Sequence, residues 1–235
     1  MTAKPMDSAF DRPLERLRPL AAGVWCAEHD HYWIGLHFRT RMTVVAVRDG
    51  LVLISPIPID DELAGDLDRL GPVRHLIAPN LMHHVYLPAA AARYPEATCH
   101  GPEGLTKKRP DVELVPLSGD SWGEELRVCR LPGAPQFDEH VLYEPNSQSL
   151  IVTDFLAHVT DASNWPTRLL FRFDAVWQRT DLPRIVRWAI KDKAALRSAA
   201  DELLSWPIAR VVPAHGEVIS DDAQQQLSHG WRHLD

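Results

Sequence analysis

Cysteine is scarce in this sequence, and the cysteines present do not form a recognisable site. The chain has three cysteines in 235 residues, namely Cys26, Cys99 and Cys129, with no Cys-x-x-Cys pair. An odd, widely spaced set argues against a disulfide framework and against a thiolate zinc site. We expect Cys99 and Cys129 to be small buried side chains within strands.

Long apolar runs are also missing. No window approaches about 18 apolar residues without a charge, and the N-terminal stretch has no apolar core of the signal-peptide kind. We therefore expect no transmembrane helix, no membrane partner and a cytoplasmic location. The composition, 45% hydrophobic and 24% charged, is that of an ordinary globular protein and excludes an intrinsically disordered chain.

Positive charge is the third shortage. Lysine and arginine number 25 against 32 acidic residues, which gives a net charge of −7. Nucleic-acid binding rewards clustered basic side chains, so we expect no nucleic-acid partner. The short basic run at 107–109 is typical of a solvated loop. A small-molecule substrate is the expected partner, and the sequence leaves open whether the chain forms a homodimer.

Hydrophobic periodicity predicts a mixture of hairpins and helices. Segments 42–47 and 51–54 flank an Asp-Gly turn, which is a strong hairpin signal. A helix is expected over 60–70, capped by Asp60 or Asp61, and further helices over 87–94, within 183–205 and over 220–234. Other strands are expected at 73–78, 98–100, 112–117, 126–131, 141–144, 149–153 and 210–213. This order indicates an α/β (α+β) domain over 20–235, with helices outside mixed sheets, after a flexible arm over 1–19.

Three groups of polar residues follow directly on apolar strands. His83 and His84 come after the strand at 73–78, Asp154 after that at 149–153, and His215 after that at 210–213. Functional residues concentrate in loops at strand ends, because the sheet positions them rigidly beside a cleft. Two or three imidazoles with one carboxylate form a ligand set for zinc or non-haem iron.

Each of these residues also has a simpler interpretation. A single histidine after a strand is more often a surface residue or a hydrogen-bonded core residue. Asp154 is suited to cap a helix over 155–159. Neighbours in a strand point in opposite directions, so His83 and His84 share a metal only in a loop or at a helix start.

The aromatic segment at 165–177 has two interpretations. Trp165, Phe171, Phe173 and Trp177 are more often core residues that pack helices onto a sheet. They are equally suited to line an apolar channel for a substrate.

Taken in order, five segments resemble the metallo-β-lactamase fold superfamily, and in particular a divergent branch of unknown function. The resemblance implies a four-layer αββα sandwich of two mixed sheets, with a metal site at one edge. The segments are RMTVVAVRDGLVLISPIPI (41–59), LGPVRHLIAPNLMHHVYL (70–87), YPEATCHGPEGLTKK (94–108), EHVLYEPNSQSLIVTDFL (139–156) and VVPAHGEVISDDA (211–223).

The first superfamily motif, HxHxDH, is degenerate here. Its first two histidines fall on Pro79 and Leu81, its aspartate on His83 and its last histidine on His84. Neither Pro79 nor Leu81 can ligate a metal through its side chain. The resemblance therefore implies that one of the two usual metal sites is lost.

The remaining positions are partly retained. The histidine of the family's next turn falls near 133–135 and is missing, with Glu139 and His140 as the nearest replacements. The bridging aspartate matches Asp154, and the final histidine matches His215.

These correspondences imply one metal ion, bound by His83, His84, Asp154 and His215. Such ligands suit Zn²⁺, and Fe²⁺ or Mn²⁺ less distinctively. A single ion with an open position lowers the pKa of bound water, which favours hydrolysis of an ester, thioester, lactone or amide. Asp154 or Glu139 would orient the water or accept its proton. The alternatives are a catalytically inactive binding or scaffold protein and, less favoured, an iron-dependent redox enzyme.

Overall fold

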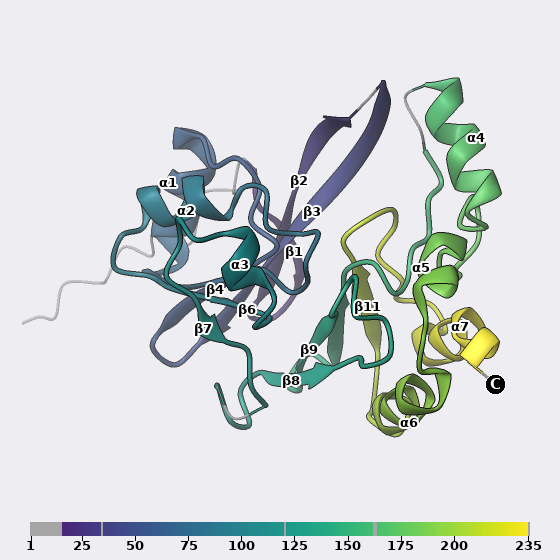
Figure 1. Cartoon of the computed structure of the whole chain (residues 1–235). Coiled ribbons are helices and arrows are strands. Elements are labelled where there is room, and N and C mark those ends of the chain that lie inside the picture. The colour runs from purple at the N-terminus through teal and green to yellow at the C-terminus, as the bar shows by residue number, and fades with distance from the viewer. Residues whose placement is uncertain (1–15, 34, 120, 162–163, 235) are drawn as a thin grey trace, which may run out of the picture.

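Two β-sheets lie face to face with helices on both outer sides, as Figure 1 shows. The computed structural model describes residues 16–33, 35–119, 121–161 and 164–234. Helices α1 and α2 cover one outer face, and α6 and α7 cover the other. The helices are α1 (Asp61–Leu70), α2 (Leu87–Arg93), α3 (Leu105–Lys108), α4 (Trp165–Phe173), α5 (Arg184–Ala189), α6 (Lys193–Leu204) and α7 (Ala223–Gly230), followed by a short 3₁₀ turn over Arg232–Leu234.

Both sheets are mixed. In the first, strands β1 to β4 pair antiparallel, and β4 to β7 pair parallel, in sequence order. In the second, β10 lies between β11, which is parallel to it, and β9, which is antiparallel. The strands are β1 (Arg18–Ala21), β2 (Val24–Trp33), β3 (Leu36–Val47), β4 (Gly50–Ile54), β5 (Val73–Ile77), β6 (Thr98–Gly101), β7 (Val115–Pro116), β8 (Arg127–Arg130), β9 (His140–Glu144), β10 (Ser149–Val152) and β11 (Arg210–Pro213).

Alternation along the strands builds the layers. In β4, Leu51 and Leu53 pack toward α1, while Val52 and Ile54 pack between the two sheets. Successive side chains of a strand point to opposite faces, so one buried apolar strand serves two cores. A third core lies between the second sheet and helices α6 and α7. Three cores separate four layers, which confirms the predicted αββα sandwich of two mixed sheets.

Most of the predicted elements are present. The β3–β4 hairpin turns at Arg48 and Asp49, and α1 begins after Asp60, whose carboxylate accepts a hydrogen bond from Leu63 N at 2.9 Å. The strand expected over 112–117 shortens to β7, and a short helix, α3, lies between β6 and β7. The three cysteines are free, with Cys99 buried and Cys129 half-buried.

The largest element that the sequence did not predict is the β2–β3 hairpin. Its strands pair from Val24 with Val45 to Trp33 with Leu36, and its tip projects beyond both sheets toward α4 (Figure 1). Its outer half carries mostly polar residues, such as His29 and Asp30, although His37 is buried there and Phe38 packs against Phe171 of α4. No run of apolar residues marks it in the sequence.

The N-terminal boundary lies earlier than predicted. Leu17 is buried, its backbone N–H donates to Asp66 of α1 at 2.9 Å, and β1 begins at Arg18. Residues 1–15, most of the predicted flexible arm, lie outside the described residues. Among those described, no helix combines the length and the apolar character needed to cross a bilayer.

Candidate metal centre

Three side chains from two sheets meet at one edge of the sandwich. His83 follows β5, Asp154 follows β10 and His215 follows β11. The Nε2 atoms of His83 and His215 lie 3.4 and 3.9 Å from Asp154 Oδ1. Strands β10 and β11 run parallel in register, so the residues that follow them emerge side by side. We call these three residues the His-Asp-His cluster.

The outer nitrogen of each imidazole is already hydrogen-bonded. His83 Nδ1 pairs with Ser55 Oγ at 2.8 Å, and His215 Nδ1 donates to the Arg39 carbonyl at 2.9 Å. Bonds of this kind fix the ring and its tautomer, which leaves the opposite nitrogen for a metal. Both Nε2 atoms face Asp154.

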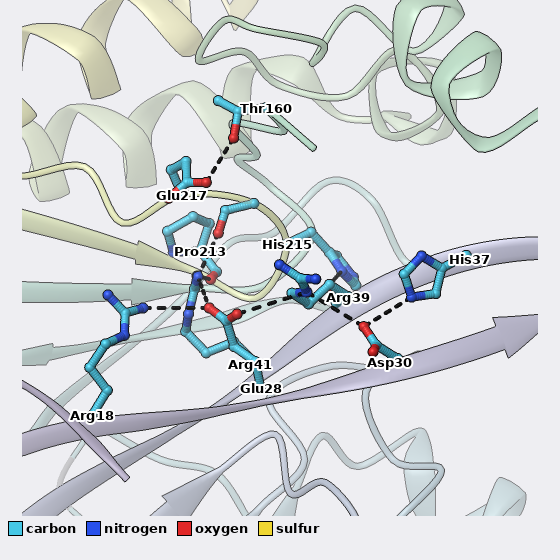
Figure 2. A network of polar contacts seen from close by, with 11 residues as sticks. Arg18, Glu28, Asp30, His37, Arg39, Arg41, Thr160, Pro213, His215 and Glu217 are labelled. Atoms are coloured by element: carbon cyan, nitrogen blue, oxygen red, sulfur yellow. Dashed lines mark hydrogen bonds and ion pairs between the residues drawn. The ribbon is translucent and has the colours of Figure 1, made fainter. Parts of the chain in front are cut away.

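Arg41 holds the turn that carries His215. Its side chain is 3% exposed, and its guanidinium donates to the carbonyls of Pro213 and Gly216 (Figure 2). Its backbone N–H also donates to the Ala214 carbonyl at 2.9 Å. Glu28, 2.5 Å from the guanidinium, balances its charge. A buried arginine thus braces the residues on both sides of His215.

Asn80 connects two carboxylates and the turn before His83. Its amide nitrogen donates to Asp154 Oδ2 and to Glu139 Oε2, both at 2.6 Å. Its carbonyl oxygen accepts from the backbone N–H groups of Met82 and His83 at 2.8 and 2.7 Å. Asn80 is fully buried. One amide therefore fixes the free oxygen of Asp154 and the backbone that positions His83.

Glu139 lies behind Asp154 and is fully buried. Its Oε1 accepts from the backbone N–H of Thr153 at 2.7 Å, and its Oε2 accepts from Asn80. Burial and the neighbouring Asp154 charge raise the pKa of Glu139 to about 7. With both oxygens engaged, Glu139 is placed to orient Asp154 rather than to contact a ligand.

The charges of the cluster depend on one another. Burial disfavours charge on both His83 and Asp154, but their mutual attraction outweighs it, so the pKa of His83 is raised and that of Asp154 is lowered. Burial and the nearby His83 lower the pKa of His215 to about 4, which keeps that imidazole neutral. Neutral imidazole and ionised carboxylate are the forms that bind metals.

The structure brings together three of the four predicted ligands. The metal-binding atoms of His83, Asp154 and His215 all lie within 4.8 Å of one another, and His84 is not in this group. Burial and the nearby Arg109 and Lys108 charges lower the pKa of His84. Consecutive side chains diverge here, so only His83 joins the cluster.

Two further expectations can be compared with the structure. Residues 155–159 form no helix, so the interpretation of Asp154 as a helix cap is wrong. His140, near the position of the family's missing histidine, is buried, and its Nδ1 is 3.0 Å from the Asp138 carbonyl.

The cluster has the donor set that a divalent cation requires. Two imidazoles and one carboxylate present converging atoms, and each ligand has a second hydrogen bond that fixes its orientation. Three protein ligands leave coordination positions for water or substrate, as in catalytic sites. It is the one group of this kind among the described residues.

Two of the cavities beside the cluster include Asp154 in their lining. One, of about 190 Å³, is lined by His31, Tyr86 and Met82 together with the cluster. The other, of about 300 Å³, lies toward α4 and α5 and includes Asp154 and His215 in its lining. Phe38 of β3 lines both. The cluster is therefore accessible from two sides.

Solved structures share this architecture. A metallo-β-lactamase from Pontibacter korlensis is 17% identical, with a TM-score of 0.63 over 93% of this chain and 98% of that one. One from Hirschia baltica is 16% identical, with a TM-score of 0.61 over 93% and 97%. The flavodiiron core of Flv1 from Synechocystis sp. PCC6803 is 15% identical, with a TM-score of 0.64 over 94% and 62%.

The chain has the metallo-β-lactamase fold. This confirms the fold that the resemblance in the sequence implied. Neither a protein-family model nor a curated protein sequence matches the chain. The sequence predicted a metal site at one edge of the two sheets, and the His-Asp-His cluster lies at such an edge.

Sequence reasoning missed Ser55 and Asn80. Both follow apolar strands, as the predicted ligands do. Serine and asparagine are common in turns, however, so their presence there does not indicate a functional site. The pair of His31 and Tyr86, joined by a hydrogen bond of 2.7 Å, was also missed. His31 lies in the unpredicted β2–β3 hairpin, so its proximity to the cluster could not be anticipated.

Gly216 lets the turn after His215 lie against the chain at His158. It has φ of +86°, and a Cβ here would lie 1.9 Å from the His158 carbonyl oxygen. We expect Gly216→Ala to destabilise the fold by at least about 2 kcal/mol and to weaken metal binding. Urea unfolding and metal titration measure both effects.

Gly65→Ala is the matched control. Gly65 is exposed within α1, and a Cβ there meets nothing within 4 Å. The change should stabilise the protein by about 0.5–1 kcal/mol, because alanine is the better helix former. If Gly216→Ala behaved like Gly65→Ala, close packing of this turn would not position His215.

Proposed function

We propose that this protein is a metal-dependent hydrolase that uses a single divalent cation, zinc by preference, at the His-Asp-His cluster. The observation that carries the proposal is the convergence of His83, Asp154 and His215, each with its second polar atom already hydrogen-bonded. When bound, such a cation polarises a carbonyl group and lowers the pKa of water. The substrates are esters, thioesters, lactones or amides.

The chain's own residues divide the remaining tasks. Asp154 uses Oδ1 toward the cation, while Asn80 holds Oδ2. Glu139 acts as a positioning residue, because it contacts the Asp154 backbone and Asn80 and lines neither of the two cavities. Of the two residues that the sequence offered for orienting the water or accepting its proton, only Asp154 lines the cavities.

Tyr86 supplies the proton donor in this scheme. Tyr86 lines the smaller cavity beside the cluster, and its hydroxyl pairs with His31 Nδ1 at 2.7 Å. Burial raises the pKa of Tyr86, so the phenol stays protonated at neutral pH. A protonated phenol hydrogen-bonds to a substrate oxygen, and His31 is placed to return the proton.

Metal analysis combined with a substrate panel tests the proposal. We expect close to one ion per chain, and hydrolysis of at least one ester, thioester, lactone or amide class. A chelator should abolish turnover, and added Zn²⁺ should restore it. A chain that binds no stoichiometric metal and turns over nothing would instead be the inactive binding or scaffold protein.

A second candidate is an iron-dependent redox enzyme. Two histidines and one carboxylate also form the ligand set of many non-haem Fe(II) sites, and one structural neighbour is a flavodiiron core. Loading with Fe(II) under anaerobic conditions, followed by exposure to oxygen, separates the candidates. Oxygen consumption coupled to a reductant, without hydrolysis by the zinc form, would favour iron.

A further inference from the structure

The larger cavity is apolar where it leaves the cluster. It holds about 300 Å³, and Asp154 and His215 form one end of it. Its walls include Phe38 of β3, Leu170 of α4 and Val186 of α5. A substrate whose reactive group lies at the cluster can therefore place its remaining portion between the β2–β3 hairpin and helices α4 and α5.

Large apolar side chains continue from this cavity to the surface. Phe173, Ile185 and Trp188 line it and are 53%, 59% and 67% exposed. The rings of Phe173 and Trp188 meet edge to face at 5.7 Å. Exposed apolar groups gathered around a concave site usually mark a binding surface. Of the two sequence interpretations of the aromatic segment, core packing is thus wrong for Phe173.

The charge in the walls restricts the ligand. Outside the cluster, Asp174 is the one charged side chain among the described lining residues, and it accepts a hydrogen bond from Ile185 N at 2.7 Å. The Arg184 guanidinium lies over the Phe173 ring, 5.2 Å from its centroid, and does not line the cavity. Away from the cluster, an anionic group buried here would find no cationic side chain among the described lining residues to pair with, which is unfavourable.

We propose that this cavity binds an uncharged hydrocarbon chain, so that the substrates are esters, thioesters or lactones of medium-length aliphatic acids. The inference rests on the proposed function, because the cavity shares Asp154 and His215 with the cluster. Its volume lies at the lower end of the range for small-molecule sites. The chain length that it accepts is therefore limited.

A homologous series tests the cavity without any reaction. Straight-chain methyl ketones are uncharged and resist hydrolysis, so calorimetry can measure their binding to the chelator-treated, metal-free protein. We expect affinity to rise about fourfold for each added methylene, then to stop rising once the cavity is full. In the metal-loaded protein, kcat/KM for the matching esters should rise with chain length in the same way.

Two matched pairs of variants locate the effect. Ile185→Asp should reduce the affinity for the longest ketone at least about tenfold, whereas Leu169→Asp should leave it unchanged. Both side chains are 59% exposed, but only Ile185 lines the cavity. Trp188→Ala and Trp165→Ala form the second pair, with exposures of 67% and 69%, and Trp165 lies outside the cavity.

The outcomes separate this inference from the proposed function. Chain-length-dependent binding that Ile185→Asp removes supports the inference even if no ester is hydrolysed. Hydrolysis of acetyl esters without any dependence on chain length would support the function and overturn the inference. If Ile185→Asp and Trp188→Ala changed the oligomeric state and left ketone affinity unaltered, the surface would be a subunit contact, and the inference would also fail.

Discussion

His83→Ala is expected to lower the affinity for a divalent cation at least about a hundredfold and to abolish metal-dependent hydrolysis. The variant removes one of three converging ligand atoms, and the Nε2 that it deletes lies 3.4 Å from Asp154 Oδ1. Competition with a coloured chelator measures the affinity, and the substrate panel measures the activity.

His84→Ala is the matched control, because it removes the same side chain one residue later. Its imidazole does not belong to the His-Asp-His cluster, so affinity and turnover should stay within about twofold of the parent protein. Circular dichroism shows whether each variant folds. Equal losses in the two variants would return His84 to the ligand set that the sequence predicted, and an unaffected His83→Ala would exclude the cluster as the metal site.

Asn80→Ala is expected to cause the largest loss of stability, about 3–5 kcal/mol. The change leaves the buried carboxylates of Glu139 and Asp154 without the amide that lies 2.6 Å from each, and leaves the Met82 and His83 N–H groups unpaired. Buried charges and donors that lose a partner are costly in this range. Urea denaturation gives the free energy of unfolding.

A control and a compensating variant make this result specific. Asn146 is exposed in the turn between β9 and β10, and Asn146→Ala should cost less than about 0.5 kcal/mol. Adding Glu139→Gln to Asn80→Ala removes one of the two buried charges and should recover part of the loss. If the double variant were no more stable than Asn80→Ala, the buried Glu139 carboxylate left without its partner would not contribute to the cost.

The sequence predicted the fold better than it predicted the site. Alternating apolar residues in 42–54 and the Asp60 cap carry local signals, and both are present in the structure. The outer half of the β2–β3 hairpin lacks such a signal, because most of its residues are polar and its partners, Tyr86 and, in α4, Thr167, lie far away in the sequence. The aromatic residues of helix α4 also differ from one another in burial, which their pattern in the sequence did not predict. Phe171 of this helix is buried, but Trp165 is 69% exposed.

The site was predicted in part, for a physical reason. Asp154 and His215 follow neighbouring parallel strands, so position in the sequence is enough to bring them together. The divergence of His83 from His84 depends on a turn whose geometry is set by Asn80. Contacts between residues far apart in the sequence, such as Ser55 with His83 or Arg41 with the turn after β11, arise only after the chain has folded.

The placement of the cluster across both sheets has a consequence for folding. His83 extends from the seven-stranded sheet, and Asp154 and His215 extend from the four-stranded sheet. A cation held by all three would therefore act as a crosslink between the two halves of the sandwich, in addition to the apolar core between the sheets and the hydrogen bonds of Arg41 and Asn80. By mass action, such a crosslink adds about 2.7 kcal/mol of stability when the free ion is at a hundred times its Kd. If the proposed cation binds there, the docking of the two sheets would depend on the availability of metal.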